Sequence, residues 1–109
     1  MMALPQQIGD ALLELKRASE FVQSDPSSWH DVMSEYNLLF LGDKFRVIYS
    51  VELAFSLKTK FGIDITAEDL NKMIPDICSH LGMKISPMIL AEDAGKPDAP
   101  IANYSIELC

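Results

Sequence analysis

Two soft side chains stand two residues apart, Cys78 and His80, and they are the first residues that suggest chemistry. Thiolate and imidazole are common zinc ligands, and a Cys–His pair can also act as nucleophile and base. Residues two apart on a helix, however, point to different sides and cannot easily hold one ion or share one proton. The other soft ligands, His30 and Cys109, stand at unrelated spacings. The sequence therefore predicts a buried cysteine and a surface histidine, with no metal and no cofactor.

Paired acids occur at Glu68-Asp69 and Glu92-Asp93, and carboxylate pairs carry out general acid–base catalysis in many enzymes. The first pair falls in the first turn of a predicted helix, where carboxylates complement the helix dipole. The second pair falls in a loop rich in Pro and Gly, where both groups are expected to be solvated. The sequence also contains no Gly-rich phosphate loop and no GxSxG or HExxH motif. These patterns predict a protein that is not an enzyme.

A segment in the middle of the chain resembles the second helix and following loop of acyl carrier proteins. The matching residues are Ser50-Val51-Glu52-Leu53, Phe61-Gly62-Ile63-Asp64-Ile65 and Asp69. In such carriers, an Asp-Ser pair just upstream of the helix supplies the serine that bears phosphopantetheine. The resemblance places Arg46-Val47 at that pair, so the serine that carrier chemistry requires is missing. A carrier-like or enzymatic protein is therefore the third interpretation of this chain.

The net charge of the 109 residues is −7, and this acidic excess argues against non-specific binding to nucleic acid. The charge is unevenly distributed, because residues 44–60 are net basic and residues 61–82 are net acidic. If the protein binds nucleic acid, the basic stretch and one later lysine must form a single patch. The cations expected in that patch are Lys44, Arg46, Lys58, Lys60 and Lys84.

The acidic stretch and the loop after it are better suited to a protein partner. Base readout favours Arg, Lys, Asn and Gln, whereas a recognition segment over residues 75–81 would offer Asp76, Ser79 and His80. We therefore expect this surface to contact another protein. The side chains predicted to make the contact are Asp69, Lys72, Asp76, His80, Glu92, Asp93, Lys96 and Asp98.

Apolar residues recur at helical spacing in the first half of the chain and predict two helices. The first covers residues 5–23, and its apolar stripe is broad enough to support a homodimer. The second covers residues 29–41, with Trp29 on its apolar stripe, and ends at Gly42-Asp43.

A third and more apolar helix is predicted over residues 45–61, ending near Gly62. Glu52 and Ser56 fall on its narrow polar strip. The β-branched residues over 45–51 leave a strand open as an alternative for that part. A short β-like segment is expected over residues 63–65.

Thr66 is predicted to cap a fourth helix that stops at Gly82. Pro75 allows two interpretations: one kinked helix, which we prefer, or two short helices forming a helix-turn-helix. Two strands follow, over residues 83–90 and 101–108, and Pro87 confines the first to a sheet edge or a bulge.

These elements predict one mainly helical α+β domain over residues 1–109. A helical pair over 5–41 precedes a winged-helix-like half over 44–109 that ends in a β-hairpin. Without a membrane segment or secretion signal, the domain is expected in the cytoplasm. The predicted function is a non-catalytic protein-interaction module, such as an adaptor, inhibitor or complex subunit. A winged-helix DNA-binding regulator is the alternative.

Overall fold

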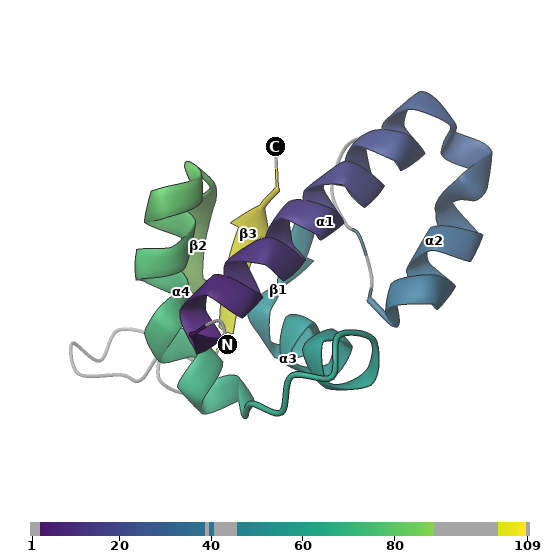
Figure 1. Cartoon of the computed structure of the whole chain (residues 1–109). Helices are drawn as coiled ribbons and strands as arrows, with labels where there is room; N and C mark the ends of the chain where they lie inside the picture. The colour runs from purple at the N-terminus through teal and green to yellow at the C-terminus, as the bar shows by residue number, and fades with distance from the viewer. Residues whose placement is uncertain (1–2, 39, 41–45, 89–102, 109) are drawn as a thin grey trace.

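Four α-helices and a three-stranded antiparallel sheet make up the part of the chain that the computed structural model describes, residues 3–38, 40, 46–88 and 103–108. A long first helix crosses in front of the sheet, and the second helix projects away from it (Figure 1). The elements, in chain order, are α1 (Leu4–Ser24), the 3-10 turn η1 (Pro26–Ser28), α2 (Trp29–Tyr36), β1 (Val47–Tyr49), α3 (Ser50–Thr59), α4 (Ala67–Leu81), β2 (Lys84–Met88) and β3 (Asn103–Glu107).

Helix α1 confirms the amphipathic pattern predicted over residues 5–23. Pro5 lies in its first turn, where the missing backbone N–H costs no helical hydrogen bond. Ile8, Leu12 and Leu15 are fully buried and pack into the common core. The same helix contacts α4 along one side and α2 near its far end, so it joins the two halves of the described fold.

Helix α2 is shorter than predicted. It ends at Tyr36, because Asn37 adopts a left-handed conformation with a φ of 50°. Asparagine tolerates that conformation better than other side chains, and the Leu38 N–H closes the turn by donating to the Met33 carbonyl at 3.2 Å. The helix predicted to continue to residue 41 is therefore wrong, while the stop expected at Gly42-Asp43 lies outside the described residues.

The helix predicted over residues 45–61 is wrong at its start. Val47–Tyr49 form β1, which pairs with β3, and the helix begins only at Ser50. The strand alternative is thus confirmed for these three residues. The segment over 63–65, predicted to be β-like, is not part of the sheet and instead links α3 to α4. Ile63 is buried in the core, and its N–H donates to the Leu57 carbonyl at 2.8 Å, which fixes the link to the end of α3.

Helix α4 is continuous across Pro75, so the single-helix interpretation is confirmed and the split into two short helices is wrong. One face is buried on both sides of the proline, with Ile74 before it and Ile77 after it, so packing against the core holds both halves in one helix although Pro75 removes a backbone donor. Gly82 ends the helix with a φ of 72°, and the Met83 N–H donates to the Cys78 carbonyl at 3.0 Å.

Replacing Thr66 with alanine is expected to lower the free energy of unfolding by about 1 kcal/mol, because its side chain accepts the Asp69 N–H at 3.1 Å and caps α4. Urea denaturation measures the loss. Ser79→Ala, at an exposed position of the same helix, is the control and should be nearly neutral. Equal stability of the two variants would show that the cap contributes nothing.

The sheet has the order β1-β3-β2, which places the last strand in the centre. The edge position predicted for Pro87 is confirmed, since β2 pairs only with β3 in the described sheet. The alternation predicted in the last strand is confirmed as well: Tyr104, Ile106 and Leu108 are buried, and helices α3 and α4 contact β3. Ile106 pairs with Ile48 on one side and with Ile85 on the other.

A buried hydroxyl joins three elements at the point where β1 becomes α3. The Ser50 side chain is fully buried, and its Oγ lies 2.5 Å from Asn71 Oδ1 on α4 and 2.9 Å from Asn103 Oδ1 on β3. A hydroxyl has one proton, so it donates to one of these oxygens at a time. The Tyr104 N–H donates to the same Oγ at 2.9 Å. We call this cluster the Ser50 node.

The Ser50 node also completes the N-terminus of α3. Tyr49, at the capping position, makes no side-chain hydrogen bond to the helix. Asn103 supplies the missing acceptor, because its Oδ1 receives the Val51 N–H at 3.1 Å. A residue of β3 therefore caps a helix that precedes it in the chain.

Candidate functional site

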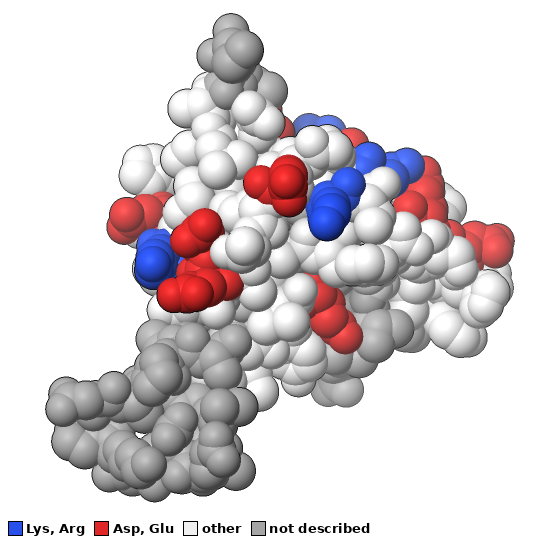
Figure 2. All heavy atoms as spheres, turned by 90° about the horizontal axis from the view of Figure 1, so that it is seen from below, with Lys and Arg blue, Asp and Glu red and all other residues white. Residues whose placement is uncertain are grey.

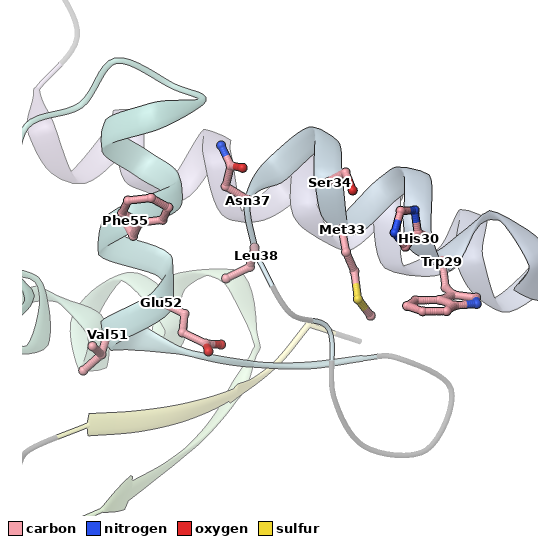
Figure 3. Close-up of a pocket in the computed structure, with 9 residues that line it drawn as sticks. All are labelled: Trp29, His30, Met33, Ser34, Asn37, Leu38, Val51, Glu52 and Phe55. Carbon is pink, nitrogen blue, oxygen red and sulfur yellow. The ribbon is translucent and has the colours of Figure 1, made fainter.

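A groove of about 630 Å³ opens between α2 and α3 (Figure 3). Both helices present apolar side chains to it, with one carboxylate and one imidazole among them. We call it the α2–α3 groove. Its lining residues are Trp29, His30, Met33, Ser34, Asn37, Leu38, Val51, Glu52 and Phe55.

Hydrogen bonds close one end of this groove. The Ser56 hydroxyl donates to the Tyr36 carbonyl at 2.5 Å, and the Asn37 side-chain amide donates to Thr59 Oγ1 at 3.1 Å. These bonds tie the C-terminal end of α2 to the second half of α3. The two helices diverge from that junction, so the groove widens toward Trp29 (Figure 3).

The walls of the groove are unusually apolar for an exposed surface. Phe55 is 57% exposed, Trp29 45% and Val51 44%. In Figure 3, Trp29 and Met33 reach down from α2 on the side toward which Glu52 points. Scattered exposed apolar residues are ordinary, but several large ones lining one hollow are typical of a binding surface. Trp29 begins α2 as its place in the predicted helix requires, but its side chain lines the groove instead of packing fully into the core.

Among the described residues, Glu52 is the one acidic side chain that lines this groove. Its Oε2 is buried and has no hydrogen-bond partner among the described residues. Burial raises the pKa of this carboxyl above its ordinary value, since desolvation disfavours the charged form. A buried, unpaired carboxylate oxygen costs free energy until a proton or a cation satisfies it. The carboxylate of Glu52 therefore lacks a hydrogen-bond donor or cation at its buried oxygen among the described residues.

A second and smaller groove, of about 290 Å³, lies between α1 and α4. It brings together two of the predicted partner-binding residues, Asp76 and His80, and adds Asp10 from α1. The His80 Nδ1 lies 3.0 Å from the Asp76 carbonyl oxygen, one helical turn earlier. None of the described residues that line this groove has an unpaired buried polar atom like that of Glu52.

Two further predicted partner residues, Asp69 and Lys72, line neither of these grooves. Asp69 and Lys72 lie on the first half of α4, where both are exposed, and Lys72 pairs with Glu68 at 3.9 Å. An exposed pair of this kind contributes little to stability. The loop residues Glu92, Asp93, Lys96 and Asp98 lie outside the described residues.

The cations proposed for nucleic-acid binding fall into separate places. Arg46 and Lys84 line one hollow together with Lys16, but Glu107 lies between them on the sheet and offsets their charge. Lys44 lies outside the described residues.

The other two cations lie away from this hollow, with Lys58 in the last turn of α3 and Lys60 directly after that helix. Lys60 pairs with Glu35 at 3.3 Å, and its Nζ lies 5.4 Å from the centre of the Tyr36 ring. On the face seen in Figure 2, basic and acidic side chains are interspersed. A phosphate-binding surface would instead gather its cations on one side.

Cys78 and His80, the pair that suggests metal or nucleophilic chemistry, differ in their exposure to solvent. Cys78 is buried, and burial raises the pKa of its thiol to about 11, which keeps it in the unreactive protonated form. His80 is exposed. Within the described ranges, no three His, Cys, Asp or Glu side chains are grouped closely enough to hold a metal ion.

None of the helices in the described part of the chain has both the length and the apolar character that a membrane span requires. Comparison with known proteins adds no relative: no family model, curated protein or solved structure matches this chain.

Proposed function

We propose that this chain is a non-catalytic protein-interaction module of the cytoplasm, built on a winged-helix-like scaffold. The order of elements supports the scaffold. Helix α1 is followed by β1, by the helices α3 and α4, and by the strands β2 and β3, with the last strand between the other two. In this interpretation α2 is an addition to the scaffold, and it creates the α2–α3 groove.

The exposed apolar lining of the α2–α3 groove is the observation that carries the proposal. Large apolar side chains such as Trp29 and Phe55 gain most when a partner removes them from water. The groove runs between two helices and is open along its length, which suits an amphipathic segment of another protein. A cleft for a small substrate would be expected to enclose its ligand more fully.

DNA binding is the weaker proposal. In a winged-helix regulator α4 would enter the major groove, and its exposed side chains include Glu68, Asp69 and Asp76 against Lys72. These acids would face phosphate or base edges at a cost in free energy. The hollow lined by Arg46 and Lys84 is the described surface where a phosphate group would find cations, so it is where DNA binding would be tested.

Capture of partners from host lysate by immobilised protein is the first test, with nuclease treatment in parallel. Trp29→Ser and Phe55→Ser should each lower recovery of the specific partner about tenfold or more, because aromatic anchors dominate interface energetics. Phe21→Ser is the matched control, since Phe21 is 54% exposed on α1 and does not line the groove.

The possible results separate the proposals. A protein retained by the wild type and by Phe21→Ser, but lost from both groove variants, supports docking in the α2–α3 groove. A partner retained equally by all four proteins would contradict it. Recovery that disappears with nuclease would place DNA binding first. If the recovered partner is the chain itself, sedimentation at micromolar concentration should show a dimer.

A further inference from the structure

We propose that the α2–α3 groove selects partner segments in which a lysine or arginine is flanked by apolar side chains, with Glu52 as the counter-ion of that cation. This inference rests on the proposed function and names the chemistry of the partner. It assigns Glu52 a specificity role within an otherwise apolar surface.

The geometry of Glu52 supports this assignment. Its Oε2 is buried and unpartnered among the described residues, yet the side chain lines an open groove. Because the Oε2 is covered, we infer that the Glu52 side chain must rotate toward the groove to meet an incoming ammonium or guanidinium group, while the backbone of α3 stays in place. Hydrogen bonds between charged groups are shorter and stronger than neutral ones, and they are strongest where water is excluded.

The walls around Glu52 suit the rest of a basic side chain. Lysine and arginine carry long aliphatic stems that pack well on apolar surface while the charged head stays with its partner. Val51, Phe55 and Met33 provide that surface, and Trp29 offers an aromatic face on which a cation is also favoured. His30 is the other titratable side chain of the lining. A cation flanked by apolar residues thus matches both the carboxylate of Glu52 and the apolar side chains beside it.

The charge of the whole protein favours the same class of partner. With a net charge of −7, the surface attracts basic segments and repels acidic ones before contact. Long-range attraction raises the association rate, and the contact with Glu52 then discriminates between a basic segment and a purely apolar one. An acidic partner would be excluded by both effects.

A random library of 12-residue peptides displayed on phage tests the inference, with separate selections on the wild type, Glu52→Gln and Phe55→Ser. Wild-type protein should enrich peptides that place Lys or Arg between apolar residues. Glu52→Gln keeps the shape of the side chain and should enrich apolar peptides without that basic preference. Phe55→Ser should enrich neither. Glu68→Gln, which removes an exposed acid on α4, is the control and should select like the wild type.

Affinity measurements on one selected peptide without tryptophan sharpen the comparison. Trp29 is the single tryptophan of the chain and lines the groove, so its fluorescence reports binding directly. Replacing the lysine of the peptide with methionine should weaken binding to the wild type about tenfold or more, and should change binding to Glu52→Gln little.

The outcomes distinguish this inference from the proposed function. Peptides that need Phe55 but show no basic preference would overturn the role of Glu52 and leave docking in the groove intact. A lysine-to-methionine effect of equal size on the wild type and Glu52→Gln would also overturn it. A selection without any peptide that depends on Phe55 would contradict the docking function itself.

Discussion

Replacing Ile106 with alanine is expected to lower the free energy of unfolding by about 3 kcal/mol. Ile106 is fully buried on the central strand, paired with Ile48 of β1 and Ile85 of β2. The substitution removes buried methyl and methylene groups and leaves a cavity that three strands and two helices surround, so relaxation into the space is limited. Urea denaturation followed by circular dichroism measures the loss.

The neighbouring residue on β3 provides a matched control. Ser105 points to the other face of the sheet, so Ser105→Ala should change stability by no more than about 0.5 kcal/mol. Ile106→Val, which deletes a single methyl group, should lie between the two at about 1 kcal/mol. If Ile106→Ala were no more harmful than Ser105→Ala, β3 could not occupy the centre of the sheet.

Replacing Ser50 with alanine is expected to cost about 2 kcal/mol, although it removes one atom only. The loss arises because Ser50 is fully buried, so removing its hydroxyl takes a hydrogen bond from each group that contacts it. Asn71 and Asn103 each lose their hydrogen bond with the Ser50 hydroxyl. The Tyr104 N–H keeps only its hydrogen bond to Asn103 Oδ1, at 3.0 Å. Buried polar groups that lose a partner are costly in this way.

A double-mutant cycle with Asn103→Ala tests whether the node acts as a unit. Asn103→Ala alone should destabilise by a similar amount, because it removes the cap of α3 as well as the bond to Ser50. The double variant should lose about 1 kcal/mol less than the sum of the two single losses. Strict additivity would mean that the two side chains act independently.

The parts of the fold that the sequence predicts well are those with local signals. Helix α4 has a capping threonine at Thr66, a left-handed glycine at Gly82 and an apolar stripe between them. The alternation of Tyr104 and Ile106 with polar neighbours identifies a half-buried strand. Each signal acts over a few residues, so it can be recognised without knowing the rest of the fold.

Strand β1 could not be distinguished from helix by local signals alone. Val47 to Tyr49 continue directly into the apolar pattern of α3, and three residues are too few to show a period of two. Their strand conformation depends on pairing with residues 105–107, which lie more than 50 positions later. Long-range pairing therefore decided a choice that propensity left open.

The candidate site was missed for a related reason. The apolar spacing of Trp29, Phe55 and Val51 is the same whether a face is buried by the chain or left for a partner. The groove depends on where α2 ends and on the hydrogen bond from Asn37 to Thr59 on α3, and this bond joins residues 22 positions apart, which local signals do not reveal. Helical spacing places Glu52 on a narrow polar strip, and the one available signal for a groove residue is that it is an acid within a mostly apolar helix.

The cap that Asn103 provides for α3 has a consequence for when the molecule becomes functional. The ribosome delivers Val51 well before Asn103, which stands 52 residues later. Until that second segment emerges, α3 lacks an acceptor at its N-terminus and β1 lacks its pairing strand. The wall of the groove that bears Val51, Glu52 and Phe55 is then unsupported. If the groove binds a partner as proposed, a nascent chain is expected to bind it only after residues 103–107 have been synthesised and have paired with β1.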